Sequence, residues 1–155
     1  MVHRVRVAKD KSEFVRGLVG NETDGASPFQ TYADLLAFAA ALGMKRQQKS
    51  PVREVSNREP APIALEIFLS RGYDRLFNLL TAVETRDPAL LSPTNAEARA
   101  ARVALFEEYA NGGLEILQAE LRGAIDYGER LLLIMLMERH TEDPHSSGFD
   151  LQQFA

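Results

Sequence analysis

The chain has 155 residues, 45% hydrophobic and 26% charged, which is the length and composition of one globular domain and excludes a disordered or fibrous chain. It contains no cysteine, which excludes disulfides, thiolate catalysis and iron–sulfur clusters. The net charge of −4 is unevenly distributed: residues 1–53 hold nine basic and five acidic residues, whereas the remainder holds nine basic and 17 acidic ones.

Neither export nor membrane insertion is expected from this sequence. The first six residues lack the apolar stretch of a secretory signal. The longest fully apolar run, Leu131–Met137, is far shorter than the roughly 20 residues needed to span a bilayer. We therefore expect a cytoplasmic protein without membrane contact.

An extended arm and a short helix are predicted at the N-terminus. His3–Val7 alternates polar and apolar residues, which is typical of an edge strand or an extended arm. Asp10, with Glu13 three residues later, has the pattern of a capping box and predicts a helix that ends at Gly20. Turn-forming residues then predict a loop over Asn21–Pro28.

A second helix is predicted from Thr31 to Gly43. Thr31 suits the N-cap position, and Asp34 would place its carboxylate near the exposed N–H groups of the first turn. The alanine-rich residues 37–41 favour the close approach of another helix, so we expect this helix to be central. Its apolar face has helical spacing and consists of Leu35, Phe38, Ala39 and Leu42.

Residues 44–62 predict a long basic loop. No apolar period survives there, and three prolines each remove a backbone hydrogen-bond donor. A connection of this length in a compact domain is usually functional or disordered. Its cations are Lys45, Arg46, Lys49, Arg53 and Arg58.

Two helical segments are predicted after the loop. The first contributes Ile63, Ile67 and Phe68 to the core and ends at a break over Arg71–Gly72. The second ends at Asp87–Pro88 and carries an apolar stripe at helical spacing that we expect to face inward. This stripe consists of Leu76, Leu79, Leu80 and Val83.

A further helix is predicted to begin at Ser92, an N-cap residue followed by proline at the first helical position. We expect Asn111–Gly113 to end it in a left-handed backbone conformation. Five residues are assigned to its faces: Val103, Phe106 and Ala110 to the buried side, and Glu107 and Glu108 mainly to water.

The remaining sequence predicts two more helices and a polar tail. One helix carries Leu114, Leu117 and Leu121 and closes at Gly123, and Asp126 caps the other. In that last helix the run Leu131–Met137 is apolar on all sides, which favours burial on most sides or an oligomer contact. The whole pattern indicates an all-α protein: one compact bundle of about six helices over residues 1–140, with a short extended arm, a long basic loop and a tail over residues 141–155.

No pattern of catalytic residues stands out. The glycines form neither a dinucleotide-binding fingerprint nor a P-loop, and no serine lies in a nucleophile elbow. Adjacent carboxylates such as Glu107 and Glu108 point about 100° apart on a helix and cannot share one substrate atom. Four potential metal ligands occur near the C-terminus, but their spacing is typical of a solvated tail; they are Glu138, His140, Asp143 and His145.

The remaining candidate site is a set of cations in the N-terminal third that could neutralise DNA phosphates independently of base sequence. The loop has no aromatic residues for stacking on unpaired bases, so a single-strand platform is disfavoured. The alternative is that scattered cations simply solvate the surface. The candidate nucleic-acid-binding residues are Arg4, Arg6, Lys9 and Lys11 on the arm, with Lys45, Arg46, Lys49 and Arg53 on the loop.

Several stretches together resemble a known family, the bacterial DNA phosphorothioation (dnd) system-associated protein 4 family. The stretches are Arg4–Lys9, Pro28–Gly43 with the basic loop ending at Pro51, Ile63–Phe68 and Glu107–Leu114. The resemblance covers about residues 3–138 and rests on structural motifs. More loosely, the first 90 residues are similar to the small helical DNA-binding subunit of the same machinery, although this chain is longer and net acidic.

The resemblance implies a cytoplasmic accessory protein encoded with the machinery that replaces a non-bridging phosphate oxygen of DNA by sulfur, or with its restriction partners in anti-phage defence. We expect a non-enzymatic protein without a cofactor that contacts DNA or a DNA-bound complex through its basic N-terminal third. Two alternatives stay open: an adaptor whose apolar C-terminal helix joins a partner or a second copy, and a metal-dependent nuclease that uses the Glu138–His145 cluster.

Overall fold

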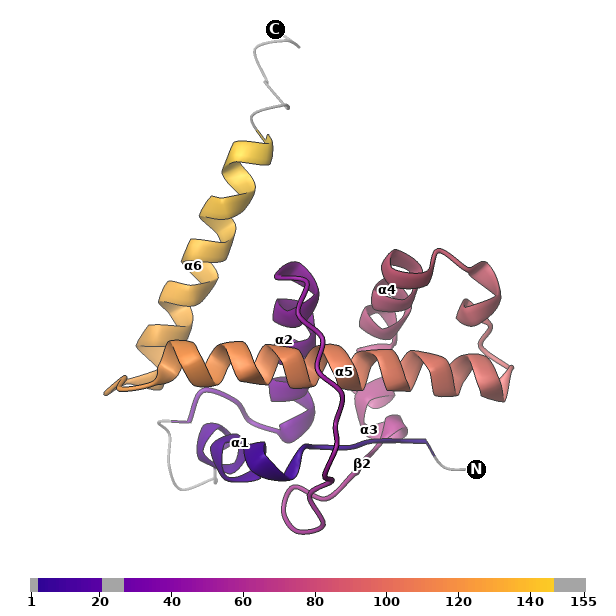
Figure 1. Ribbon diagram of the computed structural model, residues 1–155, viewed down its shortest axis with the longest axis horizontal. Helices are drawn as coiled ribbons and strands as arrows, with labels where there is room; N and C mark the ends of the chain where they lie inside the picture. The colour runs from indigo at the N-terminus through magenta and orange to yellow at the C-terminus, as the bar shows by residue number, and fades with distance from the viewer. Residues whose placement is uncertain (1–2, 21–26, 147–155) are drawn as a thin grey trace, which may run out of the picture. The chain divides into compact units, whose positions relative to one another are not determined.

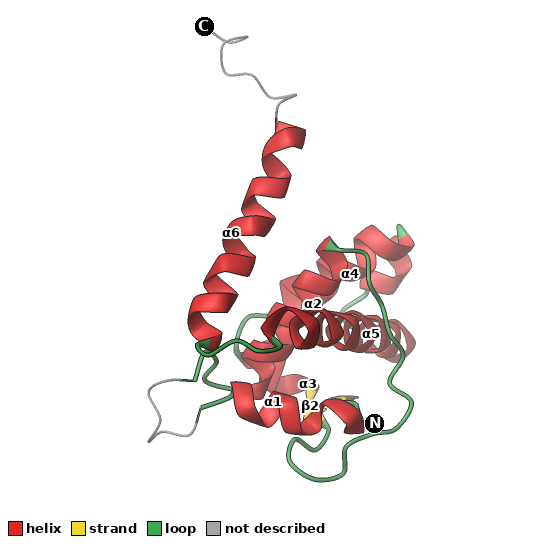
Figure 2. Cartoon of the chain, turned by 60° about the vertical axis from the view of Figure 1, so that its left-hand side comes forward, coloured by secondary structure: helices red, strands yellow, loops and turns green. Residues whose placement is uncertain are grey.

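The computed structural model describes residues 3–20 and 27–146, with side chains through residue 139, and the predicted all-α class is confirmed (Figures 1 and 2). The chain divides into two compact units, Met1–Ala119 and Glu120–Ala155. The described elements are, in chain order, β1 (Arg4–Val5), the 3-10 helix η1 (Lys9–Lys11), α1 (Ser12–Leu18), α2 (Tyr32–Lys45), β2 (Ile63–Ala64), α3 (Leu65–Ser70), α4 (Asp74–Thr85), the 3-10 helix η2 (Pro88–Leu91), α5 (Ala96–Leu121) and α6 (Tyr127–Ser146).

The predicted N-terminal arm is extended and paired. β1 and β2 are antiparallel, with Arg4 opposite Ala64 and Val5 opposite Ile63. Val5 and the following Val7 are fully buried, so the arm is anchored by its apolar side chains.

The helix after the arm forms, but the predicted capping box does not. Asp10 lies inside η1, and α1 begins after Lys11 without a side-chain cap. α1 ends at Leu18 because Val19 is extended and bridges Phe29. Most of the predicted loop at 21–28 lies outside the described residues.

α2 begins as its sequence predicts. The Thr31 hydroxyl accepts a hydrogen bond from the Asp34 backbone N–H at 3.1 Å, which satisfies one exposed donor of the first turn. On the predicted apolar face, Leu35, Ala39 and Leu42 are buried. This helix is central to the first unit, where it packs against α5 (Figure 1).

Two predicted helix ends are wrong because their glycines serve close packing instead. α2 continues through Gly43 to Lys45, and α5 runs without a break through Asn111–Gly113. A Cβ on Gly43 would clash with the Tyr109 carbonyl, and one on Gly113 would clash with the backbone of Ala39. Only glycine at these positions lets the two helix backbones approach so closely.

α5 begins three residues later than predicted. Asn95 is its cap, since the Asn95 side chain accepts from the Ala98 N–H at 3.0 Å. The Ser92 hydroxyl accepts from the Asn95 N–H at 3.2 Å and therefore orders the turn before the helix. Ser92 and Pro93 thus belong to the turn before the helix, and Asn95 supplies the side chain that caps it.

The core of the first unit contains an aromatic cluster that α3, α4 and α5 share. Phe77 stacks on Phe106 with ring centroids 4.0 Å apart, and Phe68 packs edge-on against both rings. Because Phe77 faces this cluster, the predicted apolar stripe of α4 does not face the core along its whole length. Leu79 and Val83 are about half exposed. On α5, the predicted burial of Val103, Phe106 and Ala110 is confirmed.

α6 forms the main element of the second unit. Asp126 caps it as predicted, accepting from the Glu129 N–H at 3.1 Å. The helix continues to Ser146, so the first part of the predicted tail is helical, and residues 147–155 lie outside the described residues. Within the described ranges, no helix is long and apolar enough to cross a membrane.

Of the two predictions for the apolar run in α6, burial on most sides within the chain is wrong, and an oligomer contact stays a prediction. Leu131 and Ile134 are buried, but the five other members of the run, Leu132, Leu133, Met135, Leu136 and Met137, are 42–58% exposed.

Candidate functional site

The two basic segments predicted as one site are joined by their backbones. The Lys9 N–H donates to the Glu54 carbonyl and the Ser56 N–H donates to the Val7 carbonyl, both at 2.8 Å. Ala8 and Val55 form an antiparallel bridge between these bonds. We call this region, residues 4–11 and 49–56 with the carboxylates that pair with them, the arm–loop surface.

The loop reaches the arm by crossing α5 (Figure 1). The Ser50 N–H donates to the Glu108 carbonyl at 3.0 Å, and the Asn111 amide donates to the carbonyls of Ser50 and Pro51. Gly112 makes room for this crossing, because a Cβ there would clash with the Gln48 carbonyl. The glycines of α5 therefore position the loop as well as the helix crossing.

Arg6 of the arm is paired with Glu107 of α5. The carboxylate accepts from the Arg6 backbone N–H at 2.8 Å and from its guanidinium at 2.6–3.1 Å. The hydrogen bond to Glu107 and its charge raise the pKa of Arg6 above its ordinary value. The prediction that Glu107 points to water is wrong, since this carboxylate is only 5% exposed.

Lys11 is buried and faces acidic groups. Its ammonium lies 3.4 Å from a Glu115 oxygen and 3.9 Å from Asp10, and its side chain is 3% exposed. Glu115 also accepts from the Ser50 hydroxyl and the Gln48 amide. Burial alone would raise the pKa of Glu115, but these hydrogen bonds and the charge of Lys11 outweigh it, and the pKa is lowered.

Lys49 of the loop is paired with Glu84 at the end of α4. Its ammonium contacts a Glu84 oxygen and lies 5.7 Å from the centre of the Tyr109 ring. The Tyr109 hydroxyl donates to the other Glu84 oxygen at 2.6 Å. Hydrogen bonds from Lys49 and Tyr109 lower the pKa of Glu84, while burial and this bond raise the pKa of Tyr109 to about 12.

The other predicted cations are placed differently. Arg4, Lys9 and Arg53 are exposed, and none of the described carboxylates lies within ion-pair distance of them. Lys45 ends α2 and Arg46 follows it. The structure thus brings the arm and the loop together, but it neutralises Arg6, Lys11 and Lys49 with carboxylates from distant parts of the chain.

The partners of these cations could not be found from the sequence. Glu107 and Glu115 are more than 100 residues from the arm residues they bind. The sequence predicted only that Glu107 lies on a helix, and helical spacing alone does not say which turn of a helix faces a distant segment.

The described part of the chain holds no group of three or more His, Asp or Glu side chains that could bind a metal ion. Of the four potential ligands near the C-terminus, only the Glu138 side chain lies within it.

One comparison with known proteins gives a match. A family model described as DNA sulphur modification system-associated protein 4 matches residues 4–154. No curated protein and no solved structure matches the chain.

Proposed function

We propose that this chain, which belongs to the DNA sulphur modification system-associated protein 4 family, is a non-enzymatic accessory component that works by binding another protein of such a system. The family resemblance predicted from the sequence is confirmed, and association with a DNA sulphur modification system follows from the family itself. The binding of a protein partner is our own inference from the surface of the molecule.

The observation that carries this proposal is the exposed apolar run of α6. Five large apolar side chains between Leu132 and Met137 meet solvent on one short stretch of helix. Soluble proteins rarely leave such a group uncovered, and contiguous apolar surface of this kind marks an interaction site. The ion pairs of Arg6, Lys11 and Lys49 also favour a protein partner, because they reduce the positive charge that the arm–loop surface offers to a polyanion.

A mixing experiment tests the proposal. The purified chain is combined in turn with each other protein of its system, and the mass of the mixture is measured by light scattering. We expect one combination to give a heavier complex. The double variant Leu132→Glu and Leu136→Glu, which alters neighbouring positions on α6, should abolish it. Leu79→Glu on α4 is the matched control, because that leucine is equally exposed and its variant should still form the complex.

Three results would contradict the proposal. No component gives a complex, or the α6 double variant still forms it, or the chain alone is a dimer that this variant dissociates. The last result would assign the α6 surface to a second copy of the chain.

A second candidate function, contact with DNA, is favoured by the backbone pairing of Lys9 with Glu54, the residue next to Arg53 in the chain, because it joins the two basic segments. The eight predicted cations stay the proposed contact set, and within it Arg4, Lys9 and Arg53 have their charge available. Such cations would release counterions from DNA and give binding that weakens steeply with salt.

Charge reversal tests this second candidate. Lys9→Glu combined with Arg53→Glu should abolish retention of a DNA duplex at low salt and leave the helical circular dichroism signal intact. Arg16→Glu combined with Arg75→Glu reverses two other exposed arginines and serves as the control. Equal retention by both double variants, or no retention by the unmodified chain at any salt concentration, would reject DNA contact through these residues.

A further inference from the structure

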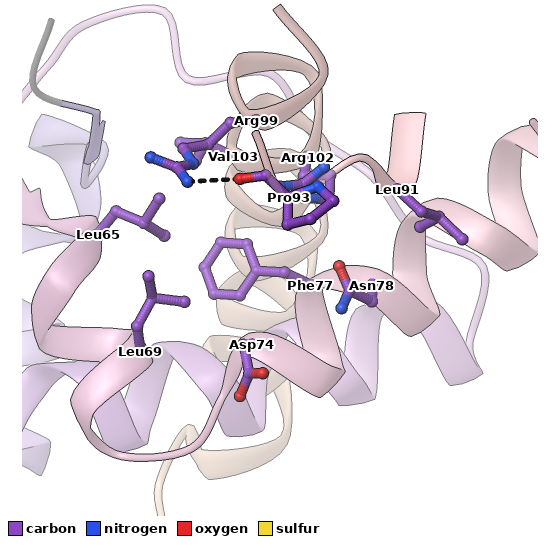
Figure 3. A pocket seen from close by; sticks show the side chains of 10 residues that line it. All are labelled: Leu65, Leu69, Asp74, Phe77, Asn78, Leu91, Pro93, Arg99, Arg102 and Val103. Atoms are coloured by element: carbon purple, nitrogen blue, oxygen red, sulfur yellow. Dashed lines mark hydrogen bonds between the residues drawn. The ribbon is translucent and has the colours of Figure 1, made fainter. Parts of the chain in front are cut away.

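A small pocket lies within the first unit, between α3, α4 and the start of α5 (Figure 3). Its volume is about 170 Å³. Leu65, Leu69, Phe77 and Val103 form an apolar wall, and Arg99 and Arg102 lie along one side.

The two arginines are held by backbone carbonyls. Arg102, which is 8% exposed, donates to the carbonyls of Leu90 and Ser92 at 2.6 and 2.9 Å. Arg99, three residues earlier on the same face of α5, donates to the Pro93 carbonyl at 2.8 Å (Figure 3). These bonds use a minority of the ten N–H donors of two guanidinium groups.

No described carboxylate pairs with either guanidinium. Asp74 also borders the pocket, but Figure 3 shows it on the far side of Phe77 from Arg99, with its carboxylate directed away. Burial and the neighbouring charge of Arg99 lower the pKa of Arg102. Two like charges in a partly buried place without a counter-charge are unfavourable, and an anion placed between them would relieve this.

The size of the pocket limits the size of the chemical group that carries the anion. A cavity of about 150 Å³ holds one benzene ring, whereas pockets for nucleotides and drug-sized ligands have about 300–1,000 Å³. The space therefore fits one side chain. The apolar wall requires that side chain to be aliphatic or aromatic, and the arginines require a carboxylate next to it.

We propose that this pocket binds the C-terminal residue of a partner protein, with an aliphatic or aromatic side chain against Leu65, Leu69 and Val103 and its α-carboxylate on Arg99 and Arg102. A chain end is the place in a protein where an apolar side chain and a full carboxylate belong to the same residue. Capture of a terminal carboxylate is an established mode of peptide recognition. The pocket and the α6 surface use different residues, so the inference stands or falls independently of the proposed function.

Methyl chemical shifts of the full chain in NMR test the proposal, with three small probes. N-acetyl-leucine carries the side chain and the carboxylate, N-acetyl-leucinamide lacks the charge, and N-acetyl-Gly-Gly-Leu extends the chain as a protein terminus would. We expect the two acids to shift the methyl signals of Leu65, Leu69 and Val103 with millimolar affinity, as suits ligands of this size. The amide should bind at least about tenfold more weakly, because charge-assisted hydrogen bonds are lost.

Two variants complete the test. Arg99→Gln should weaken binding of N-acetyl-leucine about tenfold, and this half-buried side chain is less integral to the fold than Arg102. Arg75→Gln, at an exposed position of α4 outside the pocket, should leave binding unchanged. Absence of shifts at these methyl groups, equal binding of acid and amide, or undiminished binding to Arg99→Gln would overturn the proposal. Binding of N-acetyl-leucine without the tripeptide would also overturn it, by assigning the pocket to a free small acid.

Discussion

Two groups of cations in the first unit differ in how the fold treats their charge. On the arm–loop surface, Arg6, Lys11 and Lys49 each face a carboxylate. In the pocket at the start of α5, Arg99 and Arg102 donate to backbone carbonyls, and none of the carboxylates in the described ranges pairs with them. The arm and loop are the more basic part of the sequence, yet three of their cations form ion pairs within the molecule. A count of basic residues therefore does not measure the charge that a surface offers to a partner.

The two groups differ physically because a cation of the arm–loop surface has a buried carboxylate as its partner. Glu107 is almost fully buried and binds both the backbone and the side chain of Arg6, so the arm is needed to satisfy it. The pocket arginines instead donate to carbonyls of η2 and of the turn before α5. The first group of charges holds distant segments together, and the second is the one that we propose binds a ligand.

The largest expected effect comes from moving the loop away from α5. Gly112→Ala should destabilise the protein by more than about 3 kcal/mol, because the new Cβ would displace the Gln48 backbone and with it the Lys49 and Ser50 contacts. Urea unfolding followed by circular dichroism measures the change.

The control for this variant is Gly17→Ala in α1. Nothing lies within 4 Å of a Cβ at Gly17, so alanine should stabilise its helix by up to about 1 kcal/mol. A stable Gly112→Ala protein would mean that the loop does not cross α5 at this position.

The next largest effect is expected from replacing the buried carboxylate of Glu107. Glu107→Ala should cost about 2–3 kcal/mol, because it leaves the Arg6 backbone N–H and guanidinium without their acceptor. Glu107→Gln keeps an acceptor oxygen and should cost about half as much, whereas Glu108→Ala should cost less than about 0.5 kcal/mol. Equal unfolding midpoints for the alanine variants at 107 and 108 would show that the Arg6 pair does not hold the arm.

The smallest expected effect is a difference in pH dependence: the ion pairs of the arm–loop surface should lose their contribution to stability in acid, whereas the pocket arginines should keep their charge. The pKa values of Glu84 and Glu115 are lowered in the folded state, so their pairs contribute stability above the ordinary glutamate pKa of 4.5, and this stability is lost as the pH falls through the lower folded values. The arginines of the pocket do not titrate in this range. Acid should therefore weaken the arm–loop surface and leave the charge of the pocket unchanged.

Urea midpoints at pH 7 and pH 3.5 measure this difference. The double variant Glu84→Gln and Glu115→Gln should be less stable than the unmodified chain at pH 7 and should lose less stability on acidification. Arg99→Gln should keep the pH dependence of the unmodified chain. The same acid sensitivity in all three proteins would contradict the assignment of these carboxylates.

Local patterns predicted much of the fold. Thr31, with Asp34 in the first turn, and Asp126 were identified as caps because a cap bonds to an N–H group two or three residues away. The buried face of α2 and the extended arm followed from periodicity in the same way. These features depend on residues within a few positions of one another, so they can be predicted without knowledge of the rest of the chain.

Glycine was the main source of error in the helices. Gly43 and Gly113 have the composition of helix ends, but each lies in a helix interior where a second backbone passes. The same absence of a Cβ permits a turn and a close approach, and the sequence does not show which of the two the fold uses.

By itself the sequence determined the helical class, two caps, the arm and the family, since each depends on short stretches or on their order along the chain. Only the tertiary structure decided which charges remain available. Glu107 reaches Arg6 across 101 residues of sequence, and the residues close to Arg99 and Arg102 in the chain do not reveal that no described carboxylate pairs with them. Electrostatic energy depends on distance in space and on burial, and both are set only when distant segments pack together.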